Sequence, residues 1–155
     1  FDWQKWFVPD ARGWIAFHRG DLDTAEAFFR EELQLAVEVW DKQADGFVGL
    51  GWVALKRGDL DAARAMFARG VGDSDKCIFC REGLPRVALE GKEFEEAVAQ
   101  AQAAIAIAPR KMSLLLLLDD ALEKLADPER RIGVYEALSR NHPDEALLQE
   151  RLGQA

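Results

Sequence analysis

The stretch HRGDLDTAEAFF, residues 18–29, returns almost unchanged as KRGDLDAARAMF, residues 56–67. The two copies are 38 positions apart, as the distance from Gly20 to Gly58 shows. Similar segments at a fixed spacing usually mark a repeated structural unit, because catalytic sites are seldom duplicated within one short chain. The sequence therefore predicts an array of related units.

The segments around these copies have the periodicity of helices. Residues 23–40 and 93–108 are rich in Ala, Leu, Glu and Gln, and their apolar residues return every three or four positions. The alternating pattern of a half-buried strand is missing. We therefore predict an all-α fold.

Glycines separate the predicted helices at regular places. Gly20, Gly58 and Gly91 each follow one apolar helical stretch and precede another, as a glycine in the left-handed conformation does at a helix end. Asp23 and Asp61 are expected to cap the helices that follow by accepting a backbone hydrogen bond. Each block is therefore a helix hairpin, and the turn explains the Gly-Asp pair of the RGD triplets without an adhesion role.

Small and aromatic residues keep the same register in successive blocks. Alanine comes three residues after the first apolar residue that follows each turn, where a larger side chain would push two crossing helices apart. An aromatic residue and a Leu-Gly pair come before the turn in the second block, and a proline ends the third. This pattern closely resembles the tetratricopeptide repeat, a pair of helices. The residues that carry it are Ala25, Ala63, Ala97, Phe29, Phe67, Phe47, Leu50, Gly51 and Pro109.

The resemblance implies a right-handed α-solenoid of antiparallel helix pairs, with three to four repeats and a terminal helix. The first repeat has one extra turn in its second helix, because its spacing exceeds the repeat length of the family. We expect one array over residues 1–155. Its parts are an entry segment 1–8, repeats 9–43, 44–77, 78–111 and a degenerate 112–145, and a terminal helix 146–155.

Composition restricts the partners. The chain has 20 Lys and Arg against 28 Asp and Glu, a net charge of −8, and this charge disfavours nucleic acid and anionic lipid. Its longest apolar run, residues 114–118, is too short to span a bilayer. We expect a soluble chain without membrane insertion, of unknown compartment. Because it begins at Phe1 rather than Met, we expect a piece of a longer protein or a processed product.

In the resembling family the first helix of each pair lines a concave groove that binds a partner protein or peptide. Two tryptophans occupy matched groove positions, and exposed aromatic patches usually mark contact surfaces. The alternative is that these rings are ordinary core, covered by the segment FDWQKWF or by the enlarged first repeat. The predicted groove residues are Phe7, Trp14, Phe17, His18, Val48, Trp52, Leu55, Lys56, Phe79, Glu82, Arg86 and Leu89.

One subclass of that family grips a C-terminal carboxylate with Lys and Asn residues. The matching positions here hold Asp10, Trp14, Gly49, Phe79 and Gly83, and only the indole N–H could donate from a side chain. We therefore do not expect binding of chaperone tails.

Two cysteines, Cys77 and Cys80, form a C-x-x-C motif at the expected start of a helix. A helix N-terminus lowers the pKa of a thiol, so a redox pair or a local disulfide is one interpretation. The chain lacks the βαβ context of thioredoxins and the four ligands of a closed zinc site. We favour the interpretation that both are small packing residues, and we predict no metal and no cofactor.

Enzymatic motifs are missing from the sequence. Acidic groups such as Asp119 and Asp120 fit solvated helix faces. We expect no enzyme but an adaptor or scaffold that binds an apolar peptide or amphipathic helix, with Lys56, Glu82 and Arg86 giving specificity. The alternatives are self-association as a homo-oligomer, through the segment FDWQKWF or residues 114–118, and a regulatory region of a larger enzyme or secretion protein.

Overall fold

The computed structural model describes residues 4–39 and 44–155, with side chains for 9–36 and 45–155. Every regular element within these residues is a helix, which confirms the all-α prediction. None of these helices has the length and apolar composition that a bilayer crossing requires. The helices are α1 (Gln4–Arg19), α2 (Leu22–Val39), α3 (Ala44–Lys56), α4 (Leu60–Asp73), α5 (Ile78–Glu90), α6 (Phe94–Ile105), α7 (Met112–Leu125), α8 (Pro128–Asn141) and α9 (Ala146–Gln154).

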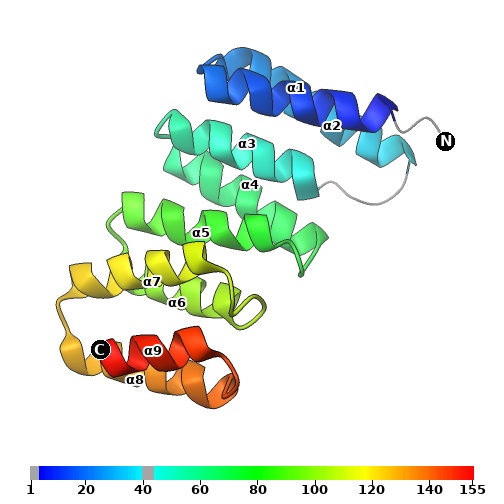
Figure 1. Cartoon of the computed structure of the whole chain (residues 1–155). Coiled ribbons are helices and arrows are strands. Elements are labelled where there is room, and N and C mark those ends of the chain that lie inside the picture. The colour runs from blue at the N-terminus through cyan, green and yellow to red at the C-terminus, as the bar shows by residue number, and fades with distance from the viewer. Residues whose placement is uncertain (1–3, 40–43) are drawn as a thin grey trace. The chain divides into compact units, whose positions relative to one another are not determined.

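The helices pack in consecutive pairs within two compact units, Phe1–Gly83 and Leu84–Ala155. In the first unit α1 packs on α2, α2 on α3 and α3 on α4, and α1 also contacts α3 (Figure 1). The contact between α1 and α3 places the first helices of two successive pairs side by side. As the spacing predicts, α2 is one turn longer than α4, with 18 residues against 14.

Phe29 of α2 is held between glycines of two other helices. Its side chain is fully buried. A Cβ atom added to Gly13 of α1 would lie 2.7 Å from Phe29 Cε1, and one added to Gly49 of α3 would lie 2.3 Å from Phe29 Cδ1. Both distances are too short for real atoms, so the ring occupies the space that side chains at these glycines would need.

Phe67 of α4 repeats this arrangement 38 residues later. An added Cβ would lie 2.6 Å from the ring at Gly51 of α3 and 2.5 Å at Gly83 of α5. Ala25 and Ala63, the small residues predicted at the helix crossings, are completely buried. Both phenylalanines therefore join their own helix pair to the next one.

The turns follow the register of the repeat rather than the position of glycine. Gly20 and Gly58 have positive φ, +81° and +78°, as predicted. The prediction for Gly91 is wrong, because the left-handed residue in the third hairpin is Lys92, at φ +59°. Lys92 lies two residues before Phe94, just as Gly58 lies two residues before Leu60. The turn geometry is thus set by where the next helix begins.

The predicted helix caps are also displaced. The cap of α4 is Asp59, not Asp61, since its Oδ1 accepts a hydrogen bond from Ala62 N at 3.0 Å. Asp21 rather than Asp23 accepts from Thr24 N in α2, at 3.2 Å. The helices start directly after the turn glycine and its aspartate, two residues earlier than expected, which makes those aspartates the N-caps.

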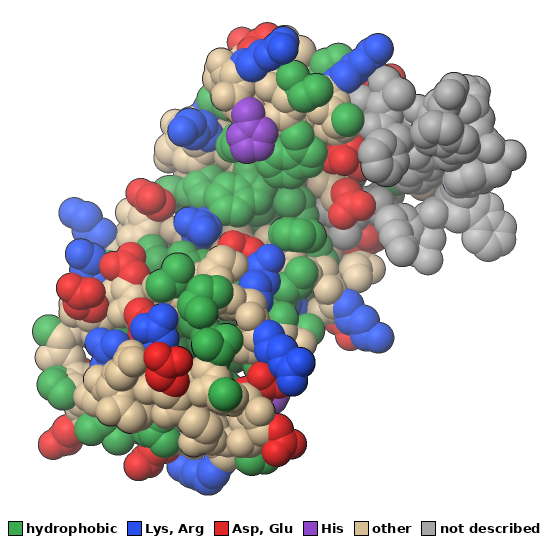
Figure 2. Space-filling model, in the orientation of Figure 1, with side chains coloured by type: hydrophobic (Ala, Val, Ile, Leu, Met, Phe, Trp, Pro, Cys, Tyr) green, Lys and Arg blue, Asp and Glu red, His purple; other side chains and the backbone are tan. Residues whose placement is uncertain are grey.

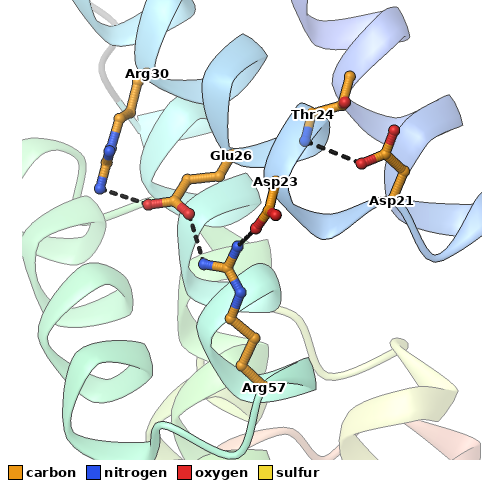
Figure 3. A network of polar contacts seen from close by, with 6 residues as sticks. All are labelled: Asp21, Asp23, Thr24, Glu26, Arg30 and Arg57. Atoms are coloured by element: carbon orange, nitrogen blue, oxygen red, sulfur yellow. Dashed lines mark hydrogen bonds and ion pairs between the residues drawn. The ribbon is translucent and has the colours of Figure 1, made fainter.

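Arg57 of the second RGD triplet connects two helix pairs. Its guanidinium donates to Glu26 and to Asp23 of α2, each at 2.5 Å, and Arg30 pairs with the other oxygen of Glu26 (Figure 3). Asp23 and Arg30 are exposed, and Glu26 and Arg57 are partly exposed, so the contribution of these ion pairs to stability is modest. Together with the Gly58 turn and the Asp59 cap, they give every residue of the triplet a structural role.

The second unit is held by a leucine core and a polar cluster. The buried core includes Leu115, Leu118, Tyr135 and, from α9, Leu148. Asp119 of α7 was expected on a solvated face, but that prediction is wrong: it accepts a 2.6 Å hydrogen bond from Tyr135 Oη. It also pairs with Arg131 of α8 at 3.2 Å and Arg151 of α9 at 2.8 Å. The cluster therefore ties together α7, α8 and α9.

The Lys92 turn gives a test of the register. Lys92→Gly should raise the free energy of unfolding by about 0.5–1 kcal/mol, because glycine adopts the left-handed conformation without a Cβ clash. Gly58→Ala, at the equivalent turn, should lower it by about 1 kcal/mol. Urea unfolding followed by circular dichroism measures both. If Lys92→Gly destabilises the protein, Lys92 does not have the left-handed conformation in this turn.

Candidate functional site

An open cavity of about 370 Å³ lies on the first unit. Helices α1, α3 and α5 contribute its lining, and its volume falls in the range of ligand pockets. Figure 2 shows hydrophobic side chains gathered over α1 and α3, with acidic side chains at the edge of this area. The residues that line the cavity are Asp10, Trp14, Asp45, Val48, Trp52 and Phe79. We call it the aromatic cavity.

Trp14 is both core and cavity wall. It is partly buried and packs on the core formed by Ala16, Ala25, Phe29 and Val53. Its ring meets that of Phe29 edge to face, with centroids 5.1 Å apart. The two interpretations of this tryptophan, core or groove, are therefore not exclusive. Its packing on Phe29 fixes the ring that faces the cavity.

Trp52 has the same relation to the second phenylalanine. Its ring lies edge to face with Phe67, with centroids 5.6 Å apart. Trp14 and Trp52 both pack against a small core formed by Val48 and Cys80. The two tryptophans thus share a common floor, because α1 and α3 are adjacent and carry them at matched positions.

The cysteines belong to this floor. Cys77 and Cys80 are joined by a disulfide, with Cα atoms 5.3 Å apart, so they are more than the small packing residues we favoured. Cys80 is fully buried. Phe79, between them in sequence, leaves 56% of its surface exposed at the cavity. The disulfide restrains the first turn of α5, which carries this ring.

Two carboxyl groups also border the aromatic cavity, and neither belongs to the groove predicted from the sequence. Asp10 of α1 and Asp45 of α3 line it. Burial raises the pKa of Asp10 above its ordinary value; a hydrogen bond with the Trp14 side chain opposes this rise, and the Asp45 carboxylate adds to it. The spacing in the sequence could have indicated Asp10 as a site residue, because it lies one helical turn before Trp14 on the same helix face.

A third carboxyl group, that of Glu32 of α2, is close enough to these two to be affected by their charge. Only 6% of the residue is exposed, and its Oε2 has no hydrogen-bond partner in the described part of the chain. Burial raises the pKa of Glu32 to about 8, and the negative charges of Asp10 and Asp45 add to this rise. The cavity therefore has an excess of negative potential at one side.

The structure brings together Trp14, Val48, Trp52 and Phe79 of the predicted groove. Five others, Phe17, His18, Leu55, Lys56 and Glu82, are described residues that do not line the cavity. Phe17 packs into the core beside Trp14, His18 is exposed with its ring against Trp14 and Phe17, Leu55 is half-buried, Lys56 is exposed, and Glu82 is buried. Arg86 and Leu89 belong to the second unit, and the side chain of Phe7 lies outside the described residues.

Among the described residues, those that line the cavity include no thiol or hydroxyl nucleophile. The described residues also contain no group of three or more His, Cys, Asp or Glu side chains placed to hold a metal ion. Aromatic faces and carboxylates bind by stacking, apolar contact and charge. This arrangement can therefore offer a ligand stacking, apolar and charged contacts.

Comparison with models of protein families finds no match for this chain, and comparison with curated proteins finds none either.

Glu32 gives a test through pH. Its folded pKa, about 8, is above the ordinary value near 4.5, so between these values the folded protein retains a proton that the unfolded chain has lost. This contribution to stability is complete below about pH 4.5 and is lost as pH rises towards 8. Glu32→Gln should not show this loss of stability, because glutamine does not titrate. The unfolding free energy of the variant, measured relative to the parent, should then rise by about 1–3 kcal/mol from about pH 5 to about pH 8.

Urea unfolding at several pH values measures this difference. Glu31→Gln is the matched control, because Glu31 is the exposed neighbour on the same helix. If the two variants show the same pH dependence, Glu32 is ionised in the folded protein at neutral pH.

Proposed function

We propose that this chain is a protein-interaction module of the tetratricopeptide type, an α-solenoid whose aromatic cavity binds an apolar segment of a partner protein. The observation that carries the proposal is the convergence of Trp14, Val48, Trp52 and Phe79 from three helices on one open cavity. Tryptophan and phenylalanine supply much contact area with few rotatable bonds, and such residues dominate binding energies at interfaces.

The packing of the first unit supports the repeat assignment. Phe29 and Phe67, 38 residues apart, each contact glycines of two first helices, and α1 lies beside α3. This is the arrangement expected when helix pairs stack in order. Residues on the first helices of such a stack lie on a common face, where a partner segment could bind across several pairs.

Self-association has less support. In the leucine-rich segment of α7, Leu114, Leu115, Leu117 and Leu118 are buried, and only Leu116 is exposed, at 54%. This segment is therefore core of the second unit rather than a free apolar face. The other candidate, FDWQKWF, has side chains outside the described residues. A regulatory role in a larger protein remains compatible with a binding module.

Phe79 provides the sharpest test. It is exposed, so Phe79→Ser should change the free energy of unfolding by less than about 0.5 kcal/mol, as most surface substitutions do. The variant should nevertheless bind at least about ten-fold more weakly to peptides selected by the parent from a random display library. Calorimetric titration gives the affinities.

Ile15→Ser is the matched control. Ile15 is similarly exposed, at 52%, on α1 of the same unit, but it does not line the aromatic cavity. It should bind the selected peptides like the parent. Failure to select any peptide, or equal losses in both variants, would contradict the proposal.

A further inference from the structure

The aromatic cavity is bordered by negatively charged side chains, which the binding of a purely apolar ligand would not require. Asp10 and Asp45 stand on different helices, α1 and α3, yet both line it. None of the ion pairs found among the described residues involves either carboxylate. Two carboxylates without a cationic partner among the described residues thus border an aromatic surface, and Asp10 also has its hydrogen bond with the Trp14 side chain.

The buried Glu32 responds to this charge. Burial and the negative charges of Asp10 and Asp45 raise its pKa, so its carboxyl group keeps a proton at neutral pH. Its Oε2 is buried without a hydrogen-bond partner in the described part of the chain. Two like charges at one cavity favour an incoming cation, because a positive group would lower the electrostatic energy of both carboxylates.

The aromatic side of the cavity favours the same kind of ligand. Trp14, Trp52 and Phe79 contribute rings to its wall. The face of an aromatic ring carries negative potential and attracts a cation, and tryptophan does so most strongly. Rings and carboxylates together therefore fit a group that is both positively charged and weakly hydrated.

We propose that the aromatic cavity recognises an arginine side chain of the partner segment, with the guanidinium between Asp10 and Asp45 and its plane against the tryptophan rings. Arginine fits better than other cations because its rigid fork of five N–H donors can reach two carboxylates at once. Its planar group also stacks on aromatic rings, whereas the ammonium of lysine is compact and strongly hydrated. The apolar neighbours of the arginine contact Val48 and Phe79.

This inference rests on the proposed peptide-binding function, so its test uses probes that separate the two. Four synthetic peptide libraries carry randomised apolar flanks around one fixed central residue: arginine, its neutral isostere citrulline, leucine or glutamate. Each is titrated against the parent, against the isosteric double variant Asp10→Asn/Asp45→Asn, and against Phe79→Ser. Asp61→Asn is the control for a change of charge, because Asp61 is exposed on α4 and does not line the cavity.

The proposal predicts that the parent binds the arginine library at least about ten-fold more tightly than the citrulline library. This preference should fall below about threefold in the double variant and persist in Asp61→Asn. It should also decrease with added salt, because it depends on charge.

Two other results would overturn it. Equal binding of the arginine, citrulline and leucine libraries, all weakened by Phe79→Ser, would leave the peptide-binding function in place and remove the arginine. Absence of binding by every library would contradict both proposals. Circular dichroism of each variant verifies that the helices are intact.

Discussion

The first unit depends on the fit of a phenylalanine ring between glycines of neighbouring helices. Phe29 fills the space over Gly13 and Gly49, and Phe67 fills the space over Gly51 and Gly83. Such close packing leaves no space for additional atoms, because protein interiors are as dense as organic crystals and an added methylene forces the backbone to move. The two rings therefore determine how closely the first helices of successive pairs approach each other.

The aromatic cavity follows from this constraint. Because α1 and α3 lie side by side, Trp14 and Trp52 converge on the cavity. Each tryptophan ring packs edge to face with one of the two phenylalanine rings. The disulfide at the start of α5 holds Phe79 at the same cavity. The residues that stabilise the unit thus also hold the aromatic cavity in shape, and this pre-organisation would reduce the entropy lost in the proposed binding of a partner.

Much of the helical architecture could be predicted from the sequence, because it depends on local patterns that repeat. The buried alanines and the left-handed Gly20 and Gly58 are examples. Lys92 could not be predicted, since a lysine in the left-handed conformation is imposed by the register of its hairpin and not by its own preference. The caps were misplaced for a related reason: either of two aspartates separated by two residues could have begun each helix.

Only the aromatic and apolar residues of the site could be predicted from the sequence. Matched positions identified the two tryptophans, but the roles of Asp10, Glu32 and Asp45 depend on three helices meeting, which no local pattern encodes. Asp119 illustrates the same limit in the second unit. In the sequence it resembles any solvated helix acid, and only the approach of Tyr135, Arg131 and Arg151 makes it a structural centre.

The free energy of unfolding of Gly49→Ala tests the central constraint most directly. Alanine normally stabilises a helix relative to glycine by about 1 kcal/mol, and Gly72→Ala should do so, because no atom lies within 4 Å of its new Cβ. Gly49→Ala should instead destabilise by about 1–3 kcal/mol through its clash with Phe29, and adding Phe29→Leu should recover part of that loss. If Gly49→Ala stabilises the protein as Gly72→Ala does, the phenylalanine rings do not set the spacing of the helices.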